Sequence, residues 1–265
     1  MLSDADAYLS AMGKAGIWRR WAVFLLLAGG LGGGIGYVLQ EPREQGLPRT
    51  LRRVLSLNER LAGQMVSHGH LVDTFPARRA VRVPRVNGNI GMGGSADTAG
   101  YAFYLATPGT GDTTGRPRYG LAALRRLPWQ ELVFDFKCVE GWSQITRWGG
   151  YRLADFARTT GLASKDGRPV LTGREPWAYK YIGLATLDGK YYVGLDMPSA
   201  LHPQTLLCTH VSGQWLPARQ GAPLRLIIPV KYGVKSIKKI GKIYASDTPP
   251  PDYWYNKGYA YDLTL

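Results

Sequence analysis

The stretch FDFKCVEGWS, residues 134–143, places a cysteine directly after a short apolar run. Residues 131–136 are rich in side chains that favour β-structure, which predicts a strand. Cys138 would then lie where this strand gives way to a loop, a common position for functional side chains. A cysteine after a strand is also an ordinary small, buried apolar residue, so this stretch alone leaves both roles open.

The composition predicts a folded, β-rich body. The chain has 265 residues, of which 45% are hydrophobic and 20% are charged, which is enough for one large domain or two small ones. Its 34 glycines and 17 prolines, with many short apolar runs between them, favour strands and loops. No Walker loop and no G-x-S-x-G motif occurs, so a nucleotide triphosphatase or hydrolase is not indicated.

The net charge of +14 is carried almost entirely by the chain beyond residue 40. Residues 1–40 contain three basic and two acidic residues, a net charge of +1, which leaves +13 for the remainder. Such a balance favours an anionic partner such as phosphate, lipid headgroups, an oxyanion or nucleic acid. General solubility is the alternative, and the pattern of basic and aromatic residues matches no recognised nucleic-acid module, so no nucleic-acid partner is expected.

The chain contains two cysteines, Cys138 and Cys208, which limits the kinds of metal site that it can form. The chain has no C-x-x-C pair, so zinc knuckles, iron–sulfur clusters and c-type haem attachment are not indicated. The sequence alone does not exclude one disulfide between the two cysteines.

An uncharged run of nineteen residues, Trp21 to Leu39, follows the pair Arg19-Arg20. This length suffices for a helix to cross a bilayer. The run fits either a retained anchor or a twin-arginine export signal, and we favour the anchor because no convincing cleavage site follows it. A buried helix of a soluble domain is a third alternative, and the flanking charges do not set an orientation.

Residues 47–67 have the spacing of an amphipathic helix, which would lie at a membrane face or pack on a core. An arginine-rich linker follows over residues 68–85, and then a glycine-rich loop over residues 86–94. Such loops can turn backbone N–H groups toward phosphate, although an ordinary turn has the same composition.

Beyond residue 100, short strands and turns alternate with a few helices. We expect strands over residues 102–106 and 224–230, and a hairpin of residues 179–186 and 191–195 around Asp188-Gly189. The expected helices are residues 121–127, 153–160 and 199–207. Five lysines in twelve residues then mark residues 231–242, either as an anion-binding patch or as a solvated strand edge.

Several short sequence motifs, in this order along the chain, resemble those of a known family. They are KCVEGWS at 137–143, WGG at 148–150, YYVGLD at 191–196, ALHPQTL at 200–206, GAPLRL at 221–226 and PVKYGVK at 229–235. From about residue 80 the chain resembles the molybdopterin-binding domain of the sulfite oxidase family. Within that family it looks most like the bacterial branch of catalytic subunits of periplasmic protein-methionine-sulfoxide reductase.

The resemblance implies an α+β fold of mixed sheets and a barrel, and the uncharged run adds one transmembrane helix before it. The expected parts are an N-terminal cytoplasmic segment over residues 1–20 and a transmembrane anchor over residues 21–40. An amphipathic helix and linker follow over residues 41–80, and the molybdopterin-binding oxidoreductase domain covers residues 81–265.

The resemblance also implies a cofactor, molybdenum-molybdopterin, whose metal is held by the Cys138 thiolate. Molybdenum accepts a soft thiolate, and coordination removes the thiol proton. Lys231 and Tyr232 are the candidate catalytic residues on the substrate side. The family's pterin-binding positions map onto Asn87, Ile90, Gly91, Thr186, Gln220, Arg225, Ser236, Ile237 and Lys238.

The implied function is oxygen-atom transfer, as sulfoxide reduction or sulfite-type oxidation, by an enzyme on the periplasmic side of the inner membrane. Sulfite oxidases proper carry an arginine shortly after the metal cysteine, where this chain has Val139-Glu140-Gly141. Electrons would be exchanged with a membrane haem b protein or a cytochrome c, and a larger membrane complex is a further expected partner. A non-catalytic accessory subunit that keeps the fold is the alternative.

Overall fold

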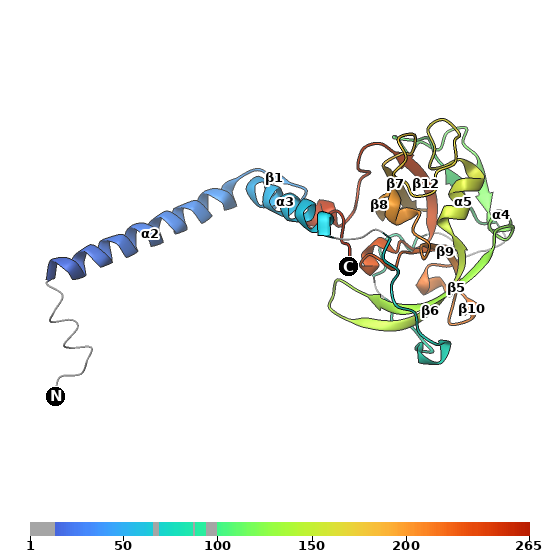
Figure 1. The fold of residues 1–265 in the computed structure, drawn as a ribbon, viewed down its shortest axis with the longest axis horizontal. Coiled ribbons are helices and arrows are strands. Elements are labelled where there is room, and N and C mark those ends of the chain that lie inside the picture. Colours follow the sequence, from blue (N-terminus) through green and yellow to red (C-terminus); the bar gives the residue numbers. More distant parts are fainter. Residues whose placement is uncertain (1–13, 66–68, 87, 94–99) are drawn as a thin grey trace. The chain divides into compact units, whose positions relative to one another are not determined.

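The computed structural model describes residues 14–65, 69–86, 88–93 and 100–265. The chain divides into two compact units, Met1–Leu57 and Asn58–Leu265, and each is described by itself (Figure 1). Among the predicted site residues, Asn87 lies outside the described residues.

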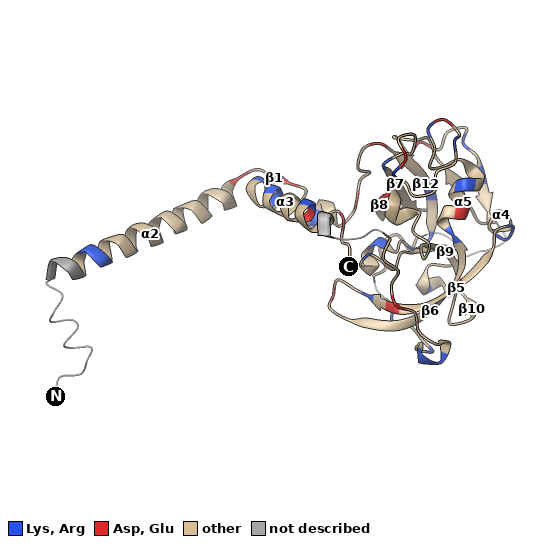
Figure 2. Ribbon diagram, viewed as in Figure 1, with Lys and Arg blue, Asp and Glu red and all other residues tan. Residues whose placement is uncertain are grey.

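A long apolar helix, α2 (Lys14–Gln40), dominates the first unit. Its segment Trp18–Gln40 is long and apolar enough to cross a membrane, and none of it is buried inside the unit. Figure 2 shows no charged residue along α2 between Arg20 and its end. This helix contains the predicted span of residues 21–40.

A short connector joins α2 to the amphipathic helix α3 (Arg49–Met65). The connector contains the two-residue strands β1 (Arg43–Glu44) and β2 (Leu47–Pro48). The Glu41 carboxylate accepts hydrogen bonds from the Thr50 backbone N–H and the Thr50 hydroxyl, both at 2.7 Å. It thereby satisfies one of the free N–H groups at the start of α3.

The second unit is built on two five-stranded sheets, so the expected α+β class is confirmed. The first sheet has the order β10-β9-β6-β5, with β11 also paired to β9. Its longest pair is the antiparallel β5–β6, in which Trp129 faces Tyr151 and Lys137 faces Ser143. Its strands are β5 (Trp129–Lys137), β6 (Ser143–Arg152), β9 (Leu206–Val211), β10 (Gln214–Trp215) and β11 (Arg225–Ile227).

The second sheet has the order β4-β3-β12-β7-β8 and contains the predicted hairpin, β7–β8. Only the contact between β12 and β3 is parallel in this sheet; the other pairs are antiparallel. Gly189 supplies the positive φ of +67° that the hairpin turn requires. The strands are β3 (Ala102–Leu105), β4 (Arg118–Gly120), β7 (Tyr181–Thr186), β8 (Tyr192–Asp196) and β12 (Ile240–Ser246).

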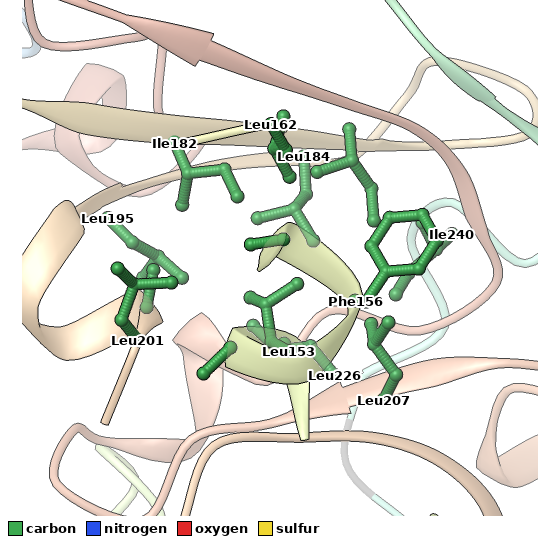
Figure 3. Packing of buried hydrophobic residues seen from close by; sticks show 14 of the residues in the cluster. Leu153, Phe156, Leu162, Ile182, Leu184, Leu195, Leu201, Leu207, Leu226 and Ile240 are labelled. Atoms are coloured by element: carbon green, nitrogen blue, oxygen red, sulfur yellow. The ribbon is translucent and has the colours of Figure 1, made fainter. Parts of the chain in front are cut away.

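Helix α5 (Leu153–Thr160) follows β6 directly and carries its apolar face into the main core. Leu153 and Phe156 are fully buried there among side chains of both sheets, including Leu207 and Ile240 (Figure 3). The other short helices are α4 (Leu121–Leu124), α6 (Met197–Ala200) and the 3-10 turns η1 (Ala77–Arg79), η2 (Ala218–Gln220), η3 (Gly233–Lys235) and η4 (Tyr255–Lys257).

Two sequence predictions of secondary structure are corrected. The helix expected over residues 199–207 is wrong, because α6 ends at Ala200 and β9 begins at Leu206. Pro203 explains this, since the residue before a proline avoids helical geometry and proline offers no N–H. The helix expected over residues 121–127 is a single turn, α4.

The lysine-rich segment is buried rather than a solvated edge. Four of its five lysines have at most 8% of their surface exposed: Lys231, Lys235, Lys238 and Lys239. Each ammonium is hydrogen-bonded inside the fold, which is the condition for burying a charge at tolerable cost.

Candidate functional site

Cys138 lies in a tight turn between β5 and β6. The Cys138 N–H donates to the Trp142 carbonyl at 2.9 Å, and the Gly141 N–H donates to the Cys138 carbonyl at 3.1 Å. Gly141 has a φ of +85°, which favours glycine at this position. The β5–β6 hairpin therefore fixes the cysteine immediately after its first strand, as the sequence predicts.

The two cysteines have separate surroundings. Neither cysteine is in a disulfide, so the pairing left open by the sequence is not formed. Cys208 is fully buried in the middle of β9, and burial raises the pKa of its thiol above the ordinary value. Cys138 instead lines a cavity. Cys208 is therefore a core residue, and Cys138 is the candidate metal-ligating cysteine.

The cavity beside Cys138 has a volume of about 160 Å³. Four predicted site residues line it, Ile90, Cys138, Ser236 and Lys238. They come from segments far apart in the chain, namely the glycine-rich loop, the β5–β6 turn and the lysine-rich segment. The remaining lining residues are Gly88, Val139, Glu140, Tyr191, Gly233, Val234, Trp254 and Tyr259.

Two lysines hold the glycine-rich loop. The Lys238 ammonium donates to the Gly88 carbonyl at 2.9 Å, and the Lys239 ammonium donates to the Met92 carbonyl at 3.1 Å. Burial, together with the positive charge of Arg225, lowers the pKa of Lys238 to about 7. An anion entering the cavity would therefore favour the protonated lysine.

Arg225 joins three predicted positions through one buried guanidinium. Its Nη1 donates to the Gln220 carbonyl and side-chain oxygens, each at 3.0 Å, and its Nη2 donates to the Ser236 carbonyl at 3.1 Å. Its Nε is buried and finds no hydrogen-bond partner within the described part of the chain. Burial lowers the pKa of Arg225 to about 10, so the group stays cationic at neutral pH.

Gly91 packs against the β7–β8 hairpin at another predicted position, Thr186. A Cβ on Gly91 would lie 2.5 Å from Thr186 Cγ2 and 2.8 Å from Tyr191 Cβ, and its φ is +75°. The Thr186 hydroxyl donates to the Asp188 carboxylate at 2.7 Å. Ile237 has its side chain in the main apolar core. Its N–H donates to the Lys235 carbonyl at 3.0 Å and its carbonyl accepts the Leu226 N–H at 2.8 Å, so its contact with a ligand stays a prediction.

The two predicted substrate-side residues lie outside the group that lines the cavity. The buried Lys231 ammonium pairs with Asp196 at 2.8 Å and with Asp262, and it donates to Thr264 at 3.0 Å. The Tyr232 N–H donates to the Leu263 carbonyl at 3.0 Å. Both residues therefore anchor the C-terminal segment, and their catalytic role stays a prediction.

Sequence reasoning missed the aromatic wall of the cavity, Tyr191, Trp254 and Tyr259. Trp254 and Tyr259 pack edge to face with ring centroids 5.0 Å apart. It also missed Glu140, whose carboxylate accepts a hydrogen bond from the Trp142 indole at 2.9 Å. The sequence is rich in aromatic residues around Trp254, but only the tertiary structure brings Trp254 and Tyr259 to the cavity.

The chain matches the family model described as the oxidoreductase molybdopterin binding domain over residues 103–254. That match covers more than half of the chain, and we conclude that the protein belongs to this family. It is a molybdopterin oxidoreductase, and the resemblance drawn from the sequence is confirmed.

Two similar proteins are named as subunits of protein-methionine-sulfoxide reductase. It is 30% identical over 216 residues, covering 82% of this chain and 76% of the relative, to an Azospira oryzae protein named provisionally as protein-methionine-sulfoxide reductase subunit YedZ1. It is 41% identical over 138 residues to the catalytic subunit MsrP of protein-methionine-sulfoxide reductase from Burkholderia mallei, covering 51% of this chain and 42% of the relative. The match to MsrP thus spans less than half of that protein.

Among solved structures, the chain is similar to the sulfane dehydrogenase SoxCD from Paracoccus pantotrophus. The TM-score is 0.42 at 16% identity, covering 56% of this chain and 39% of that chain.

The residues at the cavity fit a molybdopterin. Cys138 offers a soft sulfur ligand, and Lys238 and Ser236 offer a cation and a hydroxyl in the same cavity. The unsatisfied Nε of Arg225 is a further buried donor close to Ser236. A buried donor without a partner is costly, and an anionic ligand would remove that cost.

Proposed function

We propose that this protein is a membrane-anchored molybdopterin oxidoreductase that performs oxygen-atom transfer, with Cys138 as its protein ligand to molybdenum. The observation that carries the proposal is the position of Cys138, which is not in a disulfide and lines a cavity together with Lys238 and Ser236. When bound, the cofactor supplies two-electron redox chemistry at the metal, while the protein supplies binding, orientation and electrostatics.

The chain's own residues would hold the pterin from two sides. Lys238 and Ser236 line the cavity and would face its phosphate, because fixed cations and hydroxyls are the groups that phosphate prefers. Arg225 would support Ser236 from behind, through the hydrogen bond to its carbonyl. The glycine-rich loop, with Ile90 and Gly91, would contribute backbone groups, and Asn87 stays a predicted pterin-binding residue. Thr186 and Gln220 support these segments, and Ile237 would anchor the chain between Ser236 and Lys238 through its buried side chain.

Sulfoxide reduction is the reaction we infer, because the relatives of this chain are named as methionine-sulfoxide reductase subunits. The sulfoxide oxygen leaves as water, which consumes two protons and two electrons and leaves a thioether. Glu140 lines the cavity and is the carboxyl group placed to exchange a proton there. Lys231 and Tyr232 would act by fixing the segments around the cavity.

The electrons would come from a separate carrier, a membrane haem b protein or a cytochrome c. Helix α2 supports membrane anchoring, because its length and composition suit a span. The inner membrane, with the second unit in the periplasm, is the placement that the resemblance to periplasmic reductases implies. A larger membrane complex would bring the carrier and the cavity together.

Elemental analysis of the purified protein beside Cys138→Ser and Cys208→Ser variants tests the proposal. We expect molybdenum in the parent and in Cys208→Ser, with turnover of methionine sulfoxide by a reduced viologen dye. Cys138→Ser should lose turnover and show an altered visible spectrum of the metal site. An unchanged spectrum in Cys138→Ser would refute the ligand assignment, and bound molybdenum without turnover of sulfoxide or sulfite would favour the accessory role.

A further inference from the structure

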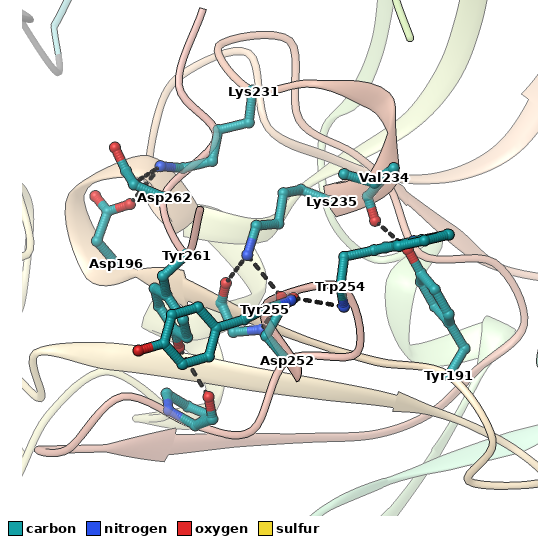
Figure 4. A network of polar contacts seen from close by, with 12 residues as sticks. Tyr191, Asp196, Lys231, Val234, Lys235, Asp252, Trp254, Tyr255, Tyr261 and Asp262 are labelled. Carbon is teal, nitrogen blue, oxygen red and sulfur yellow. Dashed lines mark hydrogen bonds and ion pairs between the residues drawn. The ribbon is translucent and has the colours of Figure 1, made fainter. Parts of the chain in front are cut away.

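A buried ion pair lies directly behind the cavity wall. The Lys235 ammonium meets the Asp252 carboxylate at 2.6 Å, and each side chain has at most 2% of its surface exposed. The ammonium also donates to the Gly194 carbonyl at 3.0 Å and lies 4.7 Å from the centre of the Tyr261 ring (Figure 4). Neither residue is among those that line the cavity.

Asp252 uses both of its carboxylate oxygens to hold different segments. Its Oδ1 accepts the backbone N–H groups of Trp254 at 3.1 Å and of Tyr255 at 3.0 Å. Its Oδ2 accepts the Gly194 N–H at 3.2 Å in addition to the Lys235 ammonium. One carboxylate therefore ties the turn that carries Trp254 to strand β8.

Lys235 lies between two residues that line the cavity, Val234 and Ser236. The Val234 carbonyl accepts the Tyr191 hydroxyl at 2.6 Å, and Tyr191 also lines the cavity (Figure 4). The ion pair thus couples the three segments that carry Val234, Tyr191 and Trp254.

We propose that Asp252 and Lys235 are positioning residues that fix Trp254 and Tyr259 within the aromatic wall against which the substrate packs. The proposal rests on the proposed function, since it takes the cavity as the site of reaction. Aromatic rings contact sulfur favourably, which suits a thioether or sulfoxide side chain entering the cavity. A wall that is misplaced should weaken substrate binding more than it slows the chemistry.

An isosteric change separates this role from general stability. In Asp252→Asn the Oδ1 acceptor for Trp254 and Tyr255 is retained, but an amide N–H₂ faces the Lys235 ammonium and the Gly194 N–H. The double variant Asp252→Asn with Lys235→Met removes the unpaired buried cation, and it serves if the single variant does not fold. Asp155→Asn is the matched control, because Asp155 is a carboxylate of α5 that forms an ion pair with Arg158 and does not line the cavity.

Two measurements apply to each full-length variant. One is amide hydrogen exchange of the peptide covering residues 253–259, compared with peptides from β5 and β7. The other is the separation of KM from kcat for methionine sulfoxide, with molybdenum content measured on the same sample.

We expect faster exchange at residues 253–259 in the Asp252 variants, unchanged exchange in β5 and β7, and parental molybdenum content. KM should rise about tenfold or more, with a smaller change in kcat, because a small displacement of a binding surface is costly. Asp155→Asn should resemble the parent in both measurements. Unchanged exchange and KM in Asp252→Asn, or an equal change in the control, would overturn the proposal. If the parent binds no molybdenum, the proposed function fails, and hydrogen exchange still decides whether Asp252 fixes the wall.

Discussion

Lys238 and Gly88 lie 150 residues apart in the sequence, and the Lys238 ammonium donates to the Gly88 carbonyl at 2.9 Å. This bond closes the glycine-rich loop onto the lysine-rich segment at the cavity. Because the pKa of Lys238 is lowered to about 7 by burial, the ammonium is easily neutralised there. The pair is therefore sensitive both to pH and to any anion in the cavity.

The first prediction concerns the pH dependence of stability in the cofactor-free protein. An unfolded lysine titrates near pH 10.4, so between about pH 7 and pH 10 the unfolded state binds one more proton than the folded state. The free energy of unfolding should therefore rise with pH over this window, by up to about 1.4 kcal/mol per unit, and flatten below pH 7. Guanidinium denaturation of the parent and of Lys238→Met checks this.

The variant should lack that contribution, so the difference between the two proteins should change across the window. Parallel pH profiles for parent and variant would show that Lys238 is not shifted.

The second prediction concerns Arg225. Arg225→Lys cannot reproduce the planar fork that reaches Gln220 and Ser236, so carbonyl groups inside the fold lose their donors. We expect the free energy of unfolding to fall by about 1–3 kcal/mol, and the purified protein to retain less molybdenum. Arg219→Lys, at an exposed neighbouring position, should stay within about 0.5 kcal/mol of the parent. Full molybdenum retention in Arg225→Lys would argue against a role in cofactor binding.

The third prediction concerns the close approach of β6 and β9. A Cβ on Gly150 would lie 2.2 Å from the Leu207 carbonyl oxygen and 2.6 Å from Cys208 Cα. Because both contacts are with backbone, Gly150→Ala should destabilise the fold by about 1–3 kcal/mol or more. The same change at Gly120, where the nearest atom is 3.5 Å away, should cost much less. The denaturation midpoints of Gly150→Ala and Gly120→Ala, measured side by side, check this. Equal midpoints would contradict the close packing of β6 against β9.

The fourth prediction concerns helix α2. Leu26 and Leu31 are exposed on it, and replacing both by Asp would place two carboxylates in the apolar span. Each charge near the centre of a spanning helix costs about 2.5–3.5 kcal/mol, so the variant should move from the membrane pellet to the soluble fraction. Leu171→Asp, at an exposed position in the second unit, should stay with the membrane. Mature protein that begins beyond residue 40 would instead identify the run as an export signal.

Local pattern alone determined a good part of this protein. The uncharged run predicted α2, the spacing of Leu51 and Val54 predicted α3, and Asp188-Gly189 predicted the β7–β8 hairpin. These features depend on neighbours in the sequence, through helical periodicity or turn geometry. The order of short words around Cys138 was enough to identify the family.

Only the tertiary structure decided the surroundings of the lysines over residues 231–242 and of the aromatic residues around Trp254. The spacing of Lys231, Lys235 and Lys238 fits a solvated edge as well as a buried network, because side-chain spacing does not report long-range partners. Asp252 and Trp254 gain their roles from Lys235 and the cavity, which chain folding brings to them from other segments. Burial and charge pairing at such sites follow from contacts between distant residues, and these are absent from any local window of the sequence.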